Sequence, residues 1–145
     1  HQAQMRYEVY KRALNEHGLE FKANWIIESD FECEGGYEAF NKMVAKGPLP
    51  SALFVCNDMM AMGVINAANE KGIQIPEELS IIGYDDIHIA KFMSPSLTTI
   101  HQPKYRLGKA AVEALLKKLE GESTDTQVVQ LEPTLVSRAT VRQLV

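Results

Sequence analysis

Cysteine and long apolar runs are scarce in this 145-residue chain. The two cysteines, Cys33 and Cys56, have no neighbouring cysteine and no CxxC spacing, so the sequence predicts neither a zinc site nor a redox motif. Free cysteines fit a reduced, cytoplasmic setting. No stretch approaches the roughly 20 apolar residues that a helix needs to span a bilayer.

Basic clusters and catalytic motifs are missing as well. The chain has 15 Lys plus Arg against 19 Asp plus Glu, a net charge of −4, and no basic run, so by itself it has no electrostatic footprint for nucleic acid. It contains no GxSxG, HExxH or P-loop motif, and its four histidines have no metal-ligand spacing. We therefore expect no enzyme activity, no cofactor and no metal, and prefer binding to catalysis.

The chain starts with HQAQMRYEVYKRAL, which resembles the beginning of a helix rather than a signal peptide. Because the first residue is not Met, we expect the natural N-terminus to lie further upstream.

Helix and strand patterns alternate along most of the sequence. Apolar residues at helical spacing predict helices at about 5–18, 34–46, 59–71 and 105–119, and a short helix or turn at 87–93. Strands are predicted at 24–28, 51–56, 79–82, 97–100, 128–131 and 134–136, with a polar loop at 120–126. Strand, helix and strand in this rhythm predict an α/β fold, in which a parallel sheet is flanked by helices within one domain.

Polar and aromatic residues follow three of the predicted strands. Asp30-Phe31 follows the first, Asn57-Asp58 the second and Tyr84-Asp85-Asp86 the third. In open α/β sheets ligands bind beyond the carboxyl ends of the strands. An aromatic ring offers a flat apolar face, and amide and carboxylate groups hydrogen-bond hydroxyls or ring nitrogens. The arrangement predicts a site for a polar, ring-shaped ligand.

Each of these residues also has a purely structural interpretation. Asp58 is the simplest N-cap for the following helix, and Asn57 could share that role. Phe31 could belong to the core, and Asp86 could accept backbone hydrogens in its own turn. Asp85 and Asp86 are adjacent and point in different directions on an extended chain, so they make a poor acid/base pair. Only the common location of these residues favours a site.

Three blocks of sequence, in this order, resemble one family. They lie between Pro50 and Pro103 and read PSALFVCNDMMAMG, GIQIPEELSIIGYDD and PSLTTIHQP. The resemblance is to the effector-binding region of LacI/GalR-type bacterial transcriptional repressors, and RYEVYKRAL from Arg6 and LVSRAT from Leu135 extend it to both ends. It implies a type I periplasmic-binding-protein-like fold, whose two subdomains close on a small molecule, and a regulator whose DNA affinity depends on that ligand.

The resemblance also implies ligand contacts. Arg6 would pair with ligand hydroxyls or a carboxyl group, and Phe31 would be the stacking aromatic. Asn57 would be the amide contact, and Asp85 the carboxylate acceptor. Gln102, where the chain crosses between subdomains, would line the cleft.

The effector implied by this set is a small molecule, with a sugar favoured and a purine as the alternative. Asp86 is expected to support the turn rather than to bind the ligand.

The resemblance divides the chain between two subdomains. Residues 1–103 would form most of the C-terminal effector-binding subdomain, 104–120 a crossover helix of an N-terminal subdomain that the chain does not contain, and 121–145 the return strands. The DNA-binding headpiece is also outside the chain, which therefore cannot itself read operator DNA.

A homodimer is implied as well, because family members dimerise through this part. The expected interface residues are Met59, Met62, Ile65, Phe92 and Met93. The alternative is that these methionines are ordinary core residues.

Two other functions compete with the regulator. A periplasmic sugar-binding protein of an ABC transporter has the same fold, but the LTTIHQP block and the LVSRAT ending favour the repressor. An enzyme of the flavodoxin-like layout is a distant third, because no phosphate-cradling glycine loop follows any strand.

Overall fold

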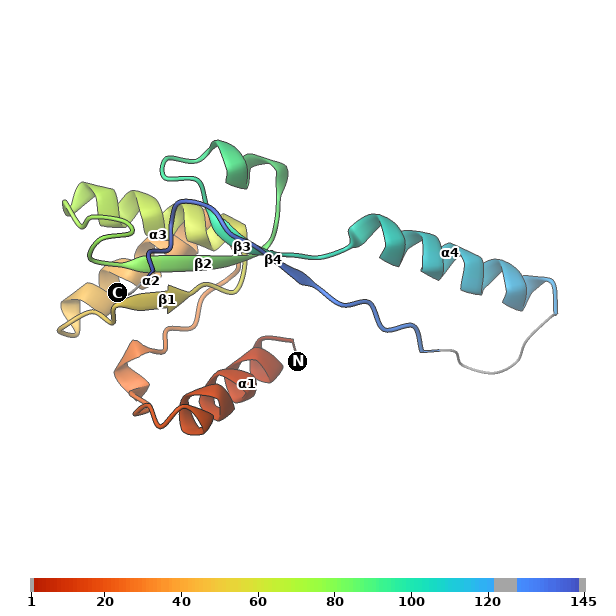
Figure 1. The fold of residues 1–145 in the computed structure, drawn as a ribbon, viewed down its shortest axis with the longest axis horizontal. Helices are drawn as coiled ribbons and strands as arrows, with labels where there is room; N and C mark the ends of the chain where they lie inside the picture. Colours follow the sequence, from red (N-terminus) through yellow and green to blue (C-terminus); the bar gives the residue numbers. More distant parts are fainter. Residues whose placement is uncertain (1, 122–127, 144–145) are drawn as a thin grey trace.

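A computed structural model describes residues 2–121 and 128–143 and contains one four-stranded sheet (Figure 1). Its strands β1 (Ala52–Phe54), β2 (Ser80–Asp85), β3 (Thr98–His101) and β4 (Thr134–Val136) lie in sequence order across the sheet. The first three are parallel and β4 is antiparallel to β3. With the helices around it, this sheet confirms the predicted α/β class.

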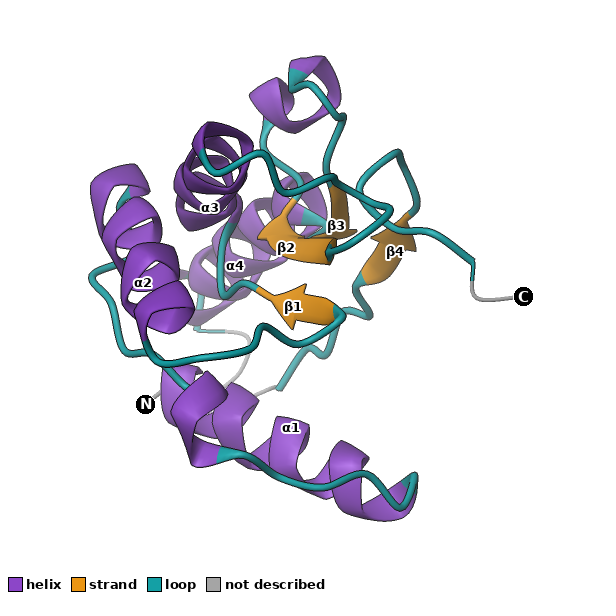
Figure 2. Cartoon of the chain, turned by 90° about the vertical axis from the view of Figure 1, so that its left-hand side faces the viewer, coloured by secondary structure: helices purple, strands orange, loops and turns teal. Residues whose placement is uncertain are grey.

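Helices precede or follow the strands as the periodicity predicts. They are α1 (Gln2–Glu16), α2 (Cys33–Ala45), α3 (Asp58–Glu70) and α4 (Lys104–Leu119), with short 3₁₀ turns η1 (Ala23–Trp25) and η2 (His88–Phe92). In Figure 2, α2 and α3 run side by side next to the sheet, and α1 lies apart from them beyond β1. None of these helices, within the described part of the chain, is long and apolar enough to cross a membrane.

The core lies between the sheet and the α2–α3 pair. Ile81 in β2 and Ala61 and Val64 in α3 are among its buried members. α2 and α3 approach closely because each has a glycine that faces the backbone of the other helix. A Cβ on Gly63 would overlap the carbonyl oxygen of Cys33, and a Cβ on Gly36 would overlap the carbonyl oxygen of Met60. This packing fixes the N-terminus of α3 against the ends of β1 and β2.

Two of the predicted strands are wrong. Residues 24–28 do not join the sheet: a 3₁₀ turn occupies Ala23–Trp25, and the Trp25 Nε1 donates to the Pro48 carbonyl at 3.0 Å. Residues 128–131 are not a strand either, and Val128 is 89% exposed. A β-forming sequence becomes a strand only where a neighbouring strand can pair with it. The predicted loop at 120–126 falls largely in 122–127, outside the described residues.

α4 extends away from the sheet as an arm (Figure 1). None of its sixteen residues, all of which are described, is buried. Leu107, Leu115 and Leu119 are between 53% and 74% exposed. An apolar stripe this exposed is unusual for a helix of a soluble domain and needs a covering surface.

Candidate ligand-binding site

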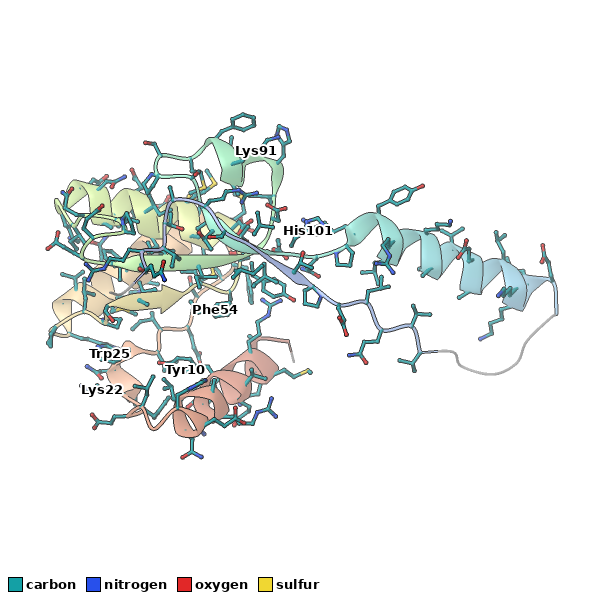
Figure 3. All side chains as sticks on the ribbon, viewed as in Figure 1. Tyr10, Lys22, Trp25, Phe54, Lys91 and His101 are labelled. Carbon is teal, nitrogen blue, oxygen red and sulfur yellow. The ribbon has the colours of Figure 1, made fainter. Side chains whose placement is uncertain are left out.

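Arg6 brings α1 to the carboxyl end of β1. Its Nη1 donates to the Cys56 carbonyl oxygen at 2.6 Å, and its Cζ lies 4.0 Å from the centre of the Tyr84 ring. The Tyr84 ring also meets the Phe54 ring edge to face, with centroids 6.5 Å apart. Figure 3 shows Phe54 on the side of the sheet that faces α1. A cation and two aromatic rings thus gather where β1 and β2 end.

Asn57 joins the N-terminus of α3 to the loop that carries Phe31. Its Oδ1 accepts from the Met60 backbone N–H at 2.9 Å, so Asn57 is the N-cap of α3. Its Nδ2 donates to the Phe31 carbonyl oxygen at 2.7 Å. Phe31 has a φ of 69° and is 40% exposed, so its ring does not belong to the core. The amide fixes the loop that presents the ring.

Asp58 is not the N-cap, and its predicted role needs correction. Its carboxylate is fully buried behind the strand ends, where it accepts from the Thr99 hydroxyl at 2.6 Å and from the Ile87 N–H at 2.9 Å. Burial raises the pKa of this carboxyl, and the two hydrogen bonds oppose that rise. Asn57 has the extended backbone conformation of a cap, and Asp58, the first helical residue, is buried behind it.

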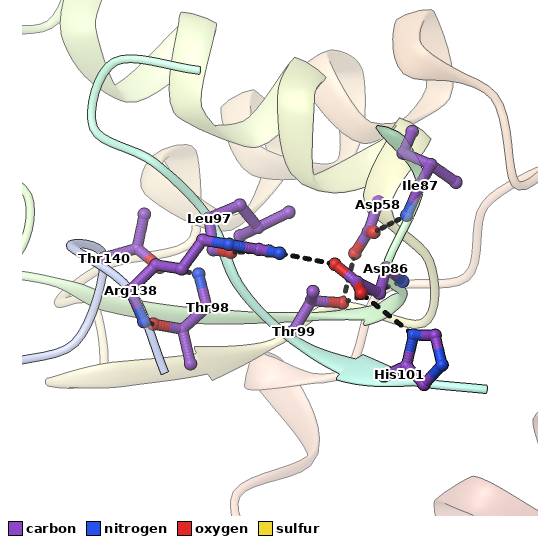
Figure 4. Close-up of polar contacts among 9 residues, drawn as sticks. All are labelled: Asp58, Asp86, Ile87, Leu97, Thr98, Thr99, His101, Arg138 and Thr140. Atoms are coloured by element: carbon purple, nitrogen blue, oxygen red, sulfur yellow. Dashed lines mark hydrogen bonds and ion pairs between the residues drawn. The ribbon is translucent and has the colours of Figure 1, made fainter. Parts of the chain in front are cut away.

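Asp85 and Asp86 face different partners, as their adjacency predicts. The Asp85 carboxylate accepts a hydrogen bond from the Gln102 side-chain amide. The Asp86 carboxylate pairs with Arg138 Nη2 at 2.6 Å and with His101 Nδ1 at 2.9 Å (Figure 4). Burial raises the pKa of Asp86, but the hydrogen bonds and charges of Arg138 and His101 outweigh burial and hold that pKa below its ordinary value. Asp86 is therefore bound by side chains, not by the backbone of its own turn.

Arg138 is the residue of this region that sequence reasoning missed. It follows β4 and lies 52 positions from Asp86 in the chain. The one sequence feature that could have identified Arg138 is its place in the LVSRAT block. His101, the other partner, lies where the chain leaves β3 for α4 (Figure 3).

The predicted ligand contacts fall into two connected groups. Arg6, Asn57 and Phe31 are joined through the end of β1, and Asp85 and Gln102 are joined to each other at the ends of β2 and β3. Next to Tyr84 and Gln102, a hollow is closed on its other side by residues of α4 and the returning chain, Leu107, Leu131 and Pro133. No group of three or more potential metal ligands occurs among the residues that the structure describes. The arrangement suits a polar organic ligand.

The predicted interface residues differ in exposure. Met59 is 39% and Phe92 64% exposed, and Met62 and Met93 are half-buried. Ile65 is only 4% exposed and packs in the core, so its side chain has no surface to offer a partner. That residue is a correction to the predicted interface.

Comparison with known families decides the relationship. The family model of the periplasmic binding protein-like domain matches residues 1–141, almost the whole chain. The chain belongs to this family. Together with the relatives below, the match makes it part of the effector-binding domain of a LacI/GalR-type regulator, as the sequence blocks indicate.

The relatives of this effector-binding domain are regulators rather than enzymes, which agrees with the preference for binding over catalysis. The HTH-type transcriptional repressor PurR of Pasteurella multocida is 49% identical over 97% of the chain and 42% of its own length. The solved complex of the transcriptional regulator CelR with cellobiose is 27% identical, with a TM-score of 0.89 over 93% of the chain and 41% of CelR.

A LacI family transcriptional regulator from Enterococcus faecium, solved with bound ribose, is 29% identical, with a TM-score of 0.82 over 94% of the chain and 50% of its own. The chain thus spans half or less of the length of these relatives.

Proposed function

We propose that this chain is the ligand-sensing part of a transcriptional repressor, in which a small effector alters the affinity of a separate DNA-binding segment for operator DNA. The protein would act in the cytoplasm, where the operator lies. A ligand shifts such an equilibrium only if it binds the two conformations of the regulator with different affinity.

The observation that carries this proposal is the meeting of polar and aromatic groups at the strand ends. The carboxylate of Asp85 ends β2, and the guanidinium of Arg6 and the loop of Phe31 are hydrogen-bonded to the residues that follow β1. This is the edge of the sheet at which α/β proteins bind ligands. Charge-assisted hydrogen bonds from such groups contribute about 1.5–3 kcal/mol each.

Each contact has capacity left for a ligand. A carboxylate accepts at about four positions, and Gln102 uses one of those that Asp85 offers. Asn57 uses one N–H and one lone pair of its amide, so a second N–H remains. We infer that Asp85 and Asn57 hydrogen-bond the effector and that Arg6 pairs with its hydroxyls or carboxyl group. Phe31 would stack on it, and Gln102 would line the cleft.

We infer a sugar as the effector, with a purine as the alternative. Bound cellobiose and ribose in two structural relatives support a sugar. Both relatives are below 30% identity, whereas the repressor PurR is 49% identical, so the sugar needs a direct test.

The decisive experiment compares Asp85→Ala with wild type in the full-length protein. Wild type should gain thermal stability with one of D-ribose, cellobiose or adenine, because a ligand that binds only the folded state raises its melting temperature. Asp85→Ala should lose that gain and the ligand response while retaining operator binding. Glu77→Ala, which removes an exposed carboxylate elsewhere, should behave as wild type. An Asp85→Ala protein that still responds to the ligand, with the wild-type midpoint of that response, would contradict the role of Asp85.

We also infer that the regulator is a homodimer through a surface that includes Met59, Met62, Phe92 and Met93. The exposure of two large apolar side chains in this set, Phe92 at 64% and Met59 at 39%, supports this proposal. Phe92→Glu should shift the full-length protein from dimer to monomer in sedimentation experiments, and Glu77→Gln should not. A variant that sediments as wild type would exclude this surface.

A further inference from the structure

Two consecutive residues at the end of β2 have a backbone conformation that L-residues avoid. The φ angle is 109° at Asp85 and 51° at Asp86. Such conformations persist only where the surroundings hold them. Because Asp85 carries the proposed effector acceptor, whatever holds this turn also decides where that carboxylate points.

Buried groups hold the backbone on both sides of Asp86. The Ile87 N–H donates to Asp58 Oδ2 at 2.9 Å, and the Asp86 N–H donates to Thr99 Oγ1 at 3.4 Å. The Thr99 hydroxyl in turn donates to Asp58 Oδ1 at 2.6 Å (Figure 4). The turn therefore rests on a carboxylate and a hydroxyl that are both fully buried.

The side chain of Asp86 is held from two other segments. Arg138 Nη2 lies 2.6 Å from one carboxylate oxygen, and His101 Nδ1 lies 2.9 Å from the other. The side chains of Arg138 and Asp86 are only 17% and 19% exposed, so water screens their pairing little. One carboxylate thus connects the end of β2 to the end of β3 and to the segment after β4.

Arg138 is itself fixed before it reaches Asp86. Its Nη1 donates to the Leu97 carbonyl oxygen at 2.7 Å, and its backbone N–H donates to Thr98 Oγ1 at 2.8 Å. The planar guanidinium is well suited to hold two acceptors at once. Arg138 thus connects the start of β3 to Asp86, the residue next to the proposed acceptor Asp85.

We propose that Arg138 is a positioning residue for effector binding: through Asp86, and together with His101, it holds the turn that directs the Asp85 carboxylate toward Gln102. This inference rests on the proposed function of Asp85. Arg138 would affect effector affinity without touching the effector.

A double-mutant cycle in the full-length protein tests the coupling. Arg138→Met and Asp86→Asn should each weaken binding of the probe that wild type binds, among D-ribose, cellobiose and adenine, by roughly tenfold, which corresponds to about 1.4 kcal/mol. If Arg138 acts through Asp86, the double variant should lose little more than either single variant. Arg138→Lys keeps the positive charge but loses the planar guanidinium that donates to two acceptors, so it should recover part of the affinity.

Arg142→Met is the matched control, since it removes an exposed arginine four positions along the same segment. It should leave affinity unchanged. Independent losses that multiply to roughly a hundredfold would overturn the inference, because unlinked sites contribute additively to free energy. So would unchanged affinity in Arg138→Met alongside lost binding in Asp85→Ala, and that outcome would leave the proposed function standing.

A crystal structure of effector-free Arg138→Met gives a readout that needs no ligand. We expect φ at Asp85 to leave the positive range and the hydrogen bond to Gln102 to be lost. An unaltered turn would overturn the inference. If wild type bound none of the probes, the proposed function would be contradicted, but this structure would still decide whether Arg138 holds the turn. If Arg138→Met does not fold, effector-free crystal structures of Arg138→Lys and of His101→Gln provide the same test.

Discussion

At the residue scale, neighbouring side chains of similar shape have different roles. Asn57 caps a helix and Asp58 beside it is buried, while Asp85 meets Gln102 and Asp86 meets Arg138. In each pair the two side chains meet different partners. A carboxylate that faces Gln102 remains available to a ligand, and one held between Arg138 and His101 does not.

The contacts of Asp86 with Arg138 and His101 should make stability depend on pH. The pKa of Asp86 is lowered in the folded state, so its contribution is fully present above the unfolded-state pKa and is lost as pH falls through the folded-state pKa. Asp86→Asn should therefore lower the free energy of unfolding at pH 7 by about 1.5–3 kcal/mol. The difference from wild type should shrink below about pH 4, the usual range of aspartate pKa values.

Urea unfolding at pH 7, 5, 4 and 3 measures this difference. Burial raises the pKa of Asp58, and the negative charge of Asp86 adds to that rise, so Asp86→Asn also lessens the rise in the Asp58 pKa. Glu77→Gln, at an exposed position, is the control. A difference between Asp86→Asn and wild type that stays constant down to pH 3 would contradict the assignment.

At the scale of elements, the site depends on how closely α3 approaches α2. Asn57 at the start of α3 reaches the Phe31 carbonyl just before α2, and Gly63 and Gly36 permit that distance. The α2–α3 contact is the most extensive between elements of the described chain. The helix pair therefore determines how far Phe31 lies from the strand ends.

Gly63→Ala should separate the two helices. The added Cβ would overlap the Cys33 carbonyl, which is backbone and cannot move aside like a flexible side chain. Overpacking of this kind costs about 1–3 kcal/mol. We expect that loss in urea unfolding, together with weaker effector binding.

Asn66→Ala is the control for Gly63→Ala, because it lies on the exposed side of the same helix. It should change the free energy of unfolding by less than about 0.5 kcal/mol. Equal stability of Gly63→Ala and wild type would mean that the helices can separate without cost.

At the scale of the whole molecule, α4 is the part that the rest of the chain leaves uncovered. Its leucine stripe is exposed, whereas α3 has buried residues along most of its length. We infer, from the family resemblance and this exposure, that residues 104–120 pack on an N-terminal subdomain in the full-length regulator.

Hydrogen exchange can test that division of the chain. In the full-length protein the amides of α4 should be protected about as well as those of α3. In residues 1–145 alone, α4 should exchange much faster than α3, because few buried contacts oppose its local unfolding. Equal protection of α4 in both proteins would contradict its assignment to another subdomain.

Most of the secondary structure, the fold class and the family could be predicted from the sequence. Hydrophobic periodicity gave the four helices, three parallel strands and the α/β class, because period and burial are local properties of the chain. The positions of Asn57 and Asp85 at strand ends followed from the same pattern, and the sequence blocks indicated the family that the comparisons confirm. Phe31 follows no strand, and a hydrogen bond from Asn57 connects its loop to the site.

The tertiary structure decided what depends on distant parts of the chain. Residues 24–28 have strand-forming composition but pair with no strand of the described sheet, since pairing requires a neighbour that composition does not reveal. Which of two adjacent Asx residues caps α3 depends on a backbone angle. Arg138 meets Asp86 across 52 positions, and only folding brings their opposite charges within 2.6 Å.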